Sequence, residues 1–300
     1  MSTTRARCVI PAAGLGTRMR PVTRFVPKEL LPIGTRPMIQ WCLTEAIEGG
    51  FEEIGVVLSD AKPALEAYLV EGGWREGLLP DLEQRAGAVS VTTFRQEEPV
   101  GVVGAVLAAG AWLEDGAVAV LLPDNVRIAG PPPITAAHLA DAARRGVVLA
   151  ACHRVGPESR HFFADVGRIE LDELTPAGAG SRVLELQERG GRGAFRAPAE
   201  GGWRLLPRYT ATEPWVDEAR REVREVALTG READDVAVHR RLVERKLLRA
   251  LPWNGTVVDA GNPAGYLCAA HLLHEAGSRE RDALDQGPTG SPVSIDLGKA

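Results

Sequence analysis

The chain has 300 residues, of which 45% are hydrophobic and 25% are charged, and its formal net charge is −5. This size and composition suit one large α/β domain or two small ones with a sizeable core, and the negative charge argues against a nucleic acid as partner. Four cysteines without a Cys-x-x-Cys pair, no visible signal peptide and no apolar stretch near the roughly 20 residues that span a membrane predict a cytoplasmic protein with no membrane partner.

Short buried strands alternate with amphipathic helices in the first half of the chain. Strands are predicted at 7–11, 54–58, 89–94, 117–122 and 147–152, and helices at 37–48, 62–70, 102–112 and 134–144. This alternation is typical of an α/β protein with a doubly wound sheet of the Rossmann-like type, mixed but mostly parallel. In such sheets, ligands bind beyond the carboxyl ends of the strands.

The second half of the chain is less regular. The sequence predicts strands at 166–171, 182–187 and 257–258, a Gly/Arg-rich loop at 190–202, and helices at 214–224, 232–249 and 263–275. The polar stretch 277–300 is predicted to be a flexible tail. We therefore expect a single domain over 1–276, with one half at about 1–150 and the other at about 151–276.

The segment 12–32, AAGLGTRMRPVTRFVPKELLP, carries the strongest chemical signal. Its glycines directly follow a buried strand, so backbone N–H groups can approach a phosphate closely. Arg18 and Lys28 add cationic side chains in the same stretch. The pattern predicts a phosphate site at the carboxyl edge of the sheet.

Two common phosphate-binding loops fit this segment poorly. A dinucleotide fingerprint needs a third Gly or Ala at the position where this chain has Met19. A Walker-type loop ends in Gly-Lys-Ser/Thr, whereas this one ends in Gly16-Thr17-Arg18. A nicotinamide oxidoreductase is therefore a distant alternative.

The run 27–41, PKELLPIGTRPMIQW, resembles the signature of the sugar nucleotidyltransferases, and within them that of the bacterial UTP–glucose-1-phosphate uridylyltransferases. The resemblance implies a nucleotidyltransferase fold with a smaller sugar-binding subregion in 151–276. It also implies a nucleoside triphosphate and a sugar 1-phosphate as substrates, Mg²⁺ as cofactor, and a homodimer or homotetramer. Residues implied to bind the nucleotide or to act in catalysis are Ala12, Ala13, Gly14, Gly16, Thr17, Arg18, Lys28 and Asp124.

Three later motifs are similar to segments of the same family. Gln96, followed by Gly101, corresponds to the base-recognition segment, and an amide can read a pyrimidine edge. Leu122-Pro123-Asp124-Asn125 and Val258-Asp259-Ala260-Gly261-Asn262 imply Mg²⁺ on Asp124 and Asp259, with room for the sugar phosphate at Gly261. The alternatives are a helix or turn cap for Asp124, an ordinary Asp-Gly turn for Asp259, and a polar loop before a helix for Gln96.

Departures from the family pattern gather in the second half. By resemblance, Gly167, Glu188 and Arg189 hold the sugar phosphate, yet Glu188-Arg189-Gly190 stands where Glu-Lys-Pro is usual. Arg189 keeps the positive charge of the usual lysine, but its planar guanidinium is not equivalent to a compact ammonium. Pro207-Arg208-Tyr209 likewise replaces Gly-Arg-Tyr. Two alternatives therefore stay open: a related enzyme with another nucleotide or acceptor, such as another hexose or a cyclitol phosphate, and a catalytically silent nucleotide-binding regulator.

Overall fold

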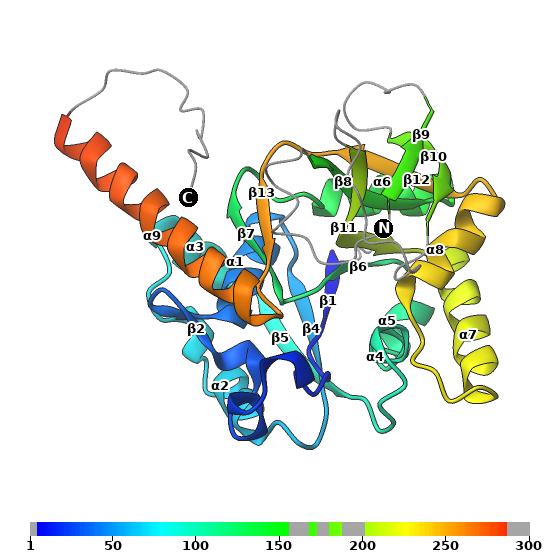
Figure 1. The fold of residues 1–300 in the computed structure, drawn as a ribbon, viewed down its shortest axis with the longest axis horizontal. Coiled ribbons are helices and arrows are strands. Elements are labelled where there is room, and N and C mark those ends of the chain that lie inside the picture. The colour runs from blue at the N-terminus through cyan, green and yellow to red at the C-terminus, as the bar shows by residue number, and fades with distance from the viewer. Residues whose placement is uncertain (1–4, 156–167, 173–179, 188–201, 287–300) are drawn as a thin grey trace.

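A computed structural model describes residues 5–155, 168–172, 180–187 and 202–286 of the chain. Within these residues, nine strands form one central sheet in the order β5-β4-β1-β6-β11-β8-β12-β10-β9 (Figure 1). Their bounds in chain order are β1 Arg7–Pro11, β4 Glu53–Leu58, β5 Ser90–Arg95, β6 Val118–Leu121, β8 Val148–Val155, β9 Arg168–Leu171, β10 Ser181–Leu186, β11 Gly202–Ala211 and β12 Leu248–Pro252. Strands from both halves of the chain thus share one sheet.

The sheet is mixed. β1 pairs in parallel with β4 and β6, β4 pairs in parallel with β5, and β12 pairs in parallel with β8. β11 lies between β6 and β8 and is antiparallel to both, and β10 is antiparallel to β12 and β9. Parallel pairing is continuous only in the block β5-β4-β1-β6, and the expected mostly parallel, doubly wound arrangement is not confirmed for the sheet as a whole.

Helices cover both faces of the sheet because the strands are apolar on both sides. One core contains Cys8 and Ile10 of β1 with α1, α2, α3 and α6, and the other contains Val9 with α4, α5, α7 and α8. No helix in the described part of the chain has both the length and the apolar composition needed to cross a bilayer. The α-helices are α1 Met38–Glu48, α2 Pro63–Val70, α3 Pro80–Ala86, α4 Val102–Leu107, α5 Ala111–Glu114, α6 Ala136–Arg145, α7 Glu213–Ala227, α8 Asp235–Glu244 and α9 Pro263–Gln286.

Several elements differ from the prediction. The helix predicted at 102–112 is divided into α4 and α5, and α3 was not predicted. The helix predicted at 232–249 is instead α8, which ends at Glu244, followed by β12 from Leu248. Lys246 adopts a left-handed conformation at φ 59° between the two elements. β11, in the middle of the sheet, was not predicted at all. α9 continues to Gln286, so residues 277–286 are helical, whereas the sequence predicted a flexible tail from 277 on.

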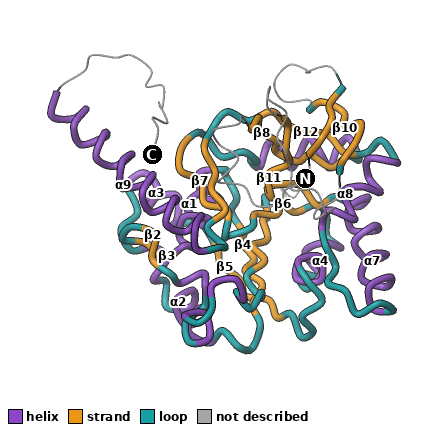
Figure 2. The backbone as a smooth tube through the Cα atoms, in the orientation of Figure 1, coloured by secondary structure: helices purple, strands orange, loops and turns teal. Residues whose placement is uncertain are grey.

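A small ribbon beside the main sheet joins distant parts of the chain (Figure 2). Its strands are β7 (Asn125–Ala129), which follows β6 closely, and β13 (Thr256–Asp259), which precedes α9. They pair antiparallel, with Asp259 opposite Asn125. A second ribbon, β2 (Pro32–Ile33) and β3 (Arg36–Pro37), leads into α1. The first ribbon brings the end of β13 to the carboxyl end of β6.

Candidate active site

A glycine loop leaves the carboxyl end of β1. Gly16 has a left-handed backbone at φ 62°, which glycine adopts without steric cost. The Thr23 hydroxyl donates a hydrogen bond of 2.8 Å to the Gly16 carbonyl, which closes the loop onto the segment that follows. A short 3₁₀ helix, η1 (Thr17–Met19), comes next and carries Arg18. The left-handed Gly16 and this hydrogen bond together define the shape of the loop.

Ala12, at the start of this loop, is held by hydrogen bonds through its backbone. Its N–H donates to the Val57 carbonyl at 2.8 Å, and its carbonyl accepts from Lys62 Nζ at 2.5 Å. Lys62 Nζ also lies 2.7 Å from Glu29 Oε2, and both side chains are buried. Both polar backbone groups of Ala12 are thus engaged within the protein. Lys62 and Glu29 were not predicted as site residues, although Lys62 follows a buried strand at the same sheet edge as the glycine loop does.

Asp124 and Asp259 meet at this edge although β6 and β13 are far apart in the sequence. Asp124 follows β6, and the Ala260 N–H donates to the Asp124 carbonyl at 2.7 Å as an extension of the β7–β13 ribbon. Each aspartate is 8% exposed. Burying a carboxylate is costly without a partner, so both need cations or N–H groups close by.

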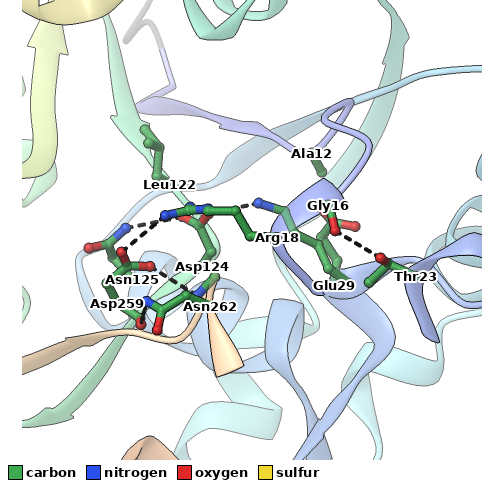
Figure 3. Close-up of polar contacts among 12 residues, drawn as sticks. Ala12, Gly16, Arg18, Thr23, Glu29, Leu122, Asp124, Asn125, Asp259 and Asn262 are labelled. Atoms are coloured by element: carbon green, nitrogen blue, oxygen red, sulfur yellow. Dashed lines mark hydrogen bonds and ion pairs between the residues drawn. The ribbon is translucent and has the colours of Figure 1, made fainter. Parts of the chain in front are cut away.

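Arg18 and Lys28 supply the positive charge. Lys28 Nζ donates to Asp124 Oδ2 at 2.7 Å. The Arg18 guanidinium reaches between the two aspartates, 3.8 Å from Asp124 Oδ2 and 3.6 Å from Asp259 Oδ2 (Figure 3). Lys28 is held by a short hydrogen bond, whereas Arg18, with a side chain 55% exposed, is held only loosely.

The two carboxyl groups have opposite pKa shifts. Burial alone would raise the pKa of Asp124, but the charge and hydrogen bond of Lys28, together with Arg18, outweigh it and lower that pKa to about 2. Burial and the neighbouring charge of Asp124 raise the pKa of Asp259. Asp124 is therefore firmly anionic, and a further cation beside Asp259 would relieve the repulsion between the two.

Gly261 leaves a small space that both aspartates face. A Cβ there would lie 2.7 Å from Asp124 Oδ2, 3.1 Å from Asp259 Oδ1 and 2.9 Å from an Arg18 nitrogen. No group of three or more His, Cys, Asp or Glu side chains in the described ranges could hold a metal by itself. Two carboxylates do fit a hard divalent cation whose other ligands are phosphate oxygens and waters.

A cleft of about 380 Å³ runs from this centre along the glycine loop. Gln96 also lines the cleft, and its Nε2 donates to the Gly101 carbonyl at 3.1 Å. Gly101 has φ 99°, and a Cβ on it would lie 2.5 Å from the Ala233 carbonyl oxygen, so Ala233 packs closely against Gly101. Residues 232–235 also line the cleft. The predicted residues that line the cleft are Ala13, Gly14, Gly16, Thr17, Arg18, Lys28, Gln96, Gly101, Asp124 and Gly261.

The other predicted residues do not line the cleft or lie outside the described part of the chain. Ala12 and Asp259 adjoin the cleft without being among the residues that line it. Gly167, Glu188 and Arg189 lie outside the described residues. Arg208, whose motif departs from the family pattern in the half expected to bind the sugar, is buried beside the Asp124 turn.

Comparisons with known proteins identify the family of the chain. The pattern of the family described as Nucleotidyl transferase matches residues 7–189. A UTP–glucose-1-phosphate uridylyltransferase of Bacillus subtilis (strain 168) is 32% identical over an alignment of 217 residues, and the match covers 69% of this chain and 70% of that protein. A second protein of the same strain, UTP–glucose-1-phosphate uridylyltransferase YngB, is 38% identical over 138 residues, 43% of this chain and 46% of its own length.

A solved structure supports the fold. A UDP-glucose pyrophosphorylase complexed with UDP-glucose superposes with a TM-score of 0.73 at 23% identity, and the match covers 91% of this chain and all of that one. At this identity the likeness speaks for the fold alone. Because the family pattern spans more than half of the chain and a relative above 30% identity is matched over more than two thirds of its length, the chain belongs to the nucleotidyl transferase family.

Proposed function

We propose that the protein transfers the uridylyl group of UTP to glucose 1-phosphate or a related sugar phosphate, giving a UDP-sugar and pyrophosphate. One observation carries the proposal: Asp124 and Asp259 face the same small space as Arg18 and Lys28, at the mouth of a cleft walled by the glycine loop. Two anionic substrates that must react with each other need such an arrangement of opposite charges.

In the proposed reaction, an oxygen of the sugar phosphate attacks the α-phosphorus of UTP. The bond from that phosphorus to the oxygen of the β-phosphate breaks, and pyrophosphate leaves with the electron pair. No covalent intermediate with the protein is needed, because catalysis consists of holding two anions in line and stabilising the charge of the transferred group.

Lys28 and Arg18 play different parts in this step. The ammonium of Lys28 has three N–H donors, so it can keep its bond to Asp124 while it donates to the α-phosphate and the incoming phosphate. The exposed and loosely held Arg18 can turn its planar fork toward the departing pyrophosphate. Asp124 and Asp259 would hold a Mg²⁺ ion, which when bound neutralises phosphate charge.

Gln96 is proposed to select the base. Its Nε2 donates to the Gly101 carbonyl at 3.1 Å, which leaves Oε1 to accept a hydrogen bond from the N3–H of uracil. N3 of cytosine carries a lone pair and no hydrogen, so it would face the Gln96 Oε1 atom without forming a hydrogen bond. UTP is therefore expected to be preferred over CTP.

Further parts of the proposal rest on the family resemblance. These are a homodimer or homotetramer, a cytoplasmic location, and a sugar phosphate held by Gly167, Glu188 and Arg189 together with Gly261. A single domain over 1–276, with the nucleotide in the first half and the sugar in the second, belongs to the same proposal.

A pyrophosphate-release screen with purified protein tests the function. The four ribonucleoside triphosphates and TTP are each combined with Mg²⁺ and a panel of hexose and cyclitol phosphates. The proposal predicts the highest kcat/KM with UTP and a hexose 1-phosphate. Tight binding of UTP by calorimetry without pyrophosphate release for any acceptor would instead identify a silent binding protein.

A further inference from the structure

Arg208 is buried in the middle of the sheet, next to the turn that carries Asp124. It lies on β11, where it pairs with Leu121 at the end of β6, and only 1% of it is exposed. Its charge partner is Glu45 of α1, which is also 1% exposed. Arg208 Nε donates to Glu45 Oε1 at 2.6 Å and Arg208 Nη2 to Glu45 Oε2 at 3.1 Å, a bidentate pair.

The remaining N–H groups of Arg208 bind the backbone on both sides of Asp124. Nη1 donates to the Leu122 carbonyl at 2.8 Å and to the Pro207 carbonyl at 3.0 Å. Nη2 donates to the Asn125 carbonyl at 2.6 Å. A guanidinium has five N–H donors, and all five are used here. The turn is thus fixed at the residues before and after Pro123-Asp124.

This turn is connected in its other direction to the second aspartate. The Asp124 carbonyl accepts from the Ala260 N–H at 2.7 Å, and the Gly261 N–H donates to Asp259 Oδ1 at 2.9 Å. A continuous set of hydrogen bonds therefore runs from Glu45 through Arg208 and the turn to Asp259. This set links the backbone that carries one carboxylate to the backbone that carries the other.

Stability alone does not account for such a pair. Burying two charges costs hydration free energy, and apolar residues of similar size often stabilise a core as well or better. Lysine could satisfy the charge of Glu45, but its single nitrogen cannot reach two carbonyls and two carboxylate oxygens in one plane. Only arginine can bind Glu45 and at the same time hold the carbonyls of Leu122 and Asn125 on the two sides of the turn.

We propose that Arg208 is a positioning residue that holds Asp124 in line with Asp259 for the transfer step. The proposal rests on the proposed function for its kinetic consequence, but its structural consequence can be measured without any turnover. Although the motif of Arg208 lies in the half of the chain expected to bind the sugar, its hydrogen bonds place it beside the Asp124 turn.

The test uses two variants and a matched control in the full chain. Arg208→Lys keeps the charge and removes the fork. The double variant Arg208→Met/Glu45→Leu replaces the pair by apolar side chains. Arg127, which lies 3.8 Å from Glu45 Oε2, keeps its ion pair with Glu48 in this variant. Arg241→Lys is the control, because Arg241 bridges Glu218 and Glu222 at 2.9 and 2.7 Å between α7 and α8 and does not line the cleft.

Three quantities are measured for each protein: hydrogen exchange of the Ala260 amide, the folded fraction by circular dichroism, and kcat and KM per folded molecule. For both Arg208 variants we expect faster exchange at Ala260 with unchanged exchange in β1 and β4, and a kcat lower by about 100-fold with KM for UTP little changed, as for a displaced catalytic group. The control is expected to keep wild-type exchange at Ala260 and wild-type kcat.

Wild-type kcat per folded molecule in either Arg208 variant, or exchange that rises equally throughout the sheet, would overturn the proposal. If the wild-type protein itself transfers no uridylyl group, the proposed function fails. The exchange of the Ala260 amide then still decides whether Arg208 holds the turn.

Discussion

Lys28 Nζ and Asp124 Oδ2 lie 2.7 Å apart, although 96 residues separate them in the chain. Lys28 comes from η3 (Lys28–Leu30), just after the glycine loop, and Asp124 from the turn after β6. Both side chains are largely buried, whereas Arg18, at 3.8 Å from the same oxygen, is mostly exposed. The two cations of the site are therefore held to different degrees.

This difference predicts different phenotypes for the two cations. Arg18→Ala should lower kcat about 100- to 1,000-fold, as for loss of a donor to developing charge, without changing the unfolding midpoint. Lys28→Met should lower kcat at least as much and also destabilise the protein, because it removes the closest cation from a buried carboxylate. Steady-state kinetics and thermal unfolding measure both, with Arg144→Ala on α6 as a control. An active Arg18→Ala would remove Arg18 from the mechanism.

Gly261→Ala should abolish turnover and leave the fold intact. The added methyl would lie 2.7 Å from Asp124 Oδ2 and 3.1 Å from Asp259 Oδ1, within the space where phosphate and cation are expected. Gly87→Ala is the control, since its Cβ would come no closer than 3.3 Å to another atom and Gly87 does not line the cleft. Circular dichroism and the pyrophosphate assay measure the outcome. Full activity of Gly261→Ala would mean that this space is not used.

Lys62→Met should leave the buried Glu29 carboxylate without its ion-pair partner. Removal of one partner of a buried ion pair is expected to lower the free energy of unfolding by about 3–5 kcal/mol. The double variant Lys62→Met/Glu29→Leu should recover most of this stability. Its KM for UTP should stay raised, because the Ala12 carbonyl has lost its donor and the glycine loop is less well fixed. Chemical denaturation and kinetics separate the two effects. Wild-type KM in the double variant would limit Lys62 to a role in stability.

The four thiols should differ in reactivity. Cys8, Cys42 and Cys152 are buried, and burial raises the pKa of Cys42 and of Cys152 to about 12, so neither forms a thiolate at neutral pH. Cys268 on α9 is half-buried. Labelling of the native protein with a thiol reagent at pH 8 should therefore modify Cys268 first, and Cys268→Ser should abolish the fast phase. Rapid modification of two or more thiols would contradict the packing described here.

The strands that the first half contributes to the central sheet could be predicted because their signals are local. A buried β-branched run such as Glu53–Leu58 and the glycines that follow Arg7–Pro11 define their own elements. β11 could not be predicted in this way. It contains Pro207 and two buried arginines, Arg204 and Arg208, which are unusual in a central strand.

Long-range contacts explain the exceptions in β11. The pairing of β11 with β8 shifts register between Leu205 and Tyr209, an irregularity that accommodates Pro207. The charge of Arg208 is balanced by Glu45, 163 residues away.

The candidate site likewise depends partly on local motifs and partly on long-range contacts. Asp124 and Asp259 could be selected by motif, but their juxtaposition depends on the β7–β13 register, and the supporting roles of Lys62 and Arg208 depend on contacts that no short pattern reveals.

The most direct test of the account is phosphorus NMR of the reaction with UTP, glucose 1-phosphate and Mg²⁺, for the wild-type protein and for Asp259→Asn. The account predicts that the wild type converts the UTP resonances into those of a UDP-sugar and pyrophosphate, and that Asp259→Asn, although folded, does so at least about 100-fold more slowly. A wild-type spectrum that stays unchanged, or an Asp259→Asn variant as fast as the wild type, would contradict it.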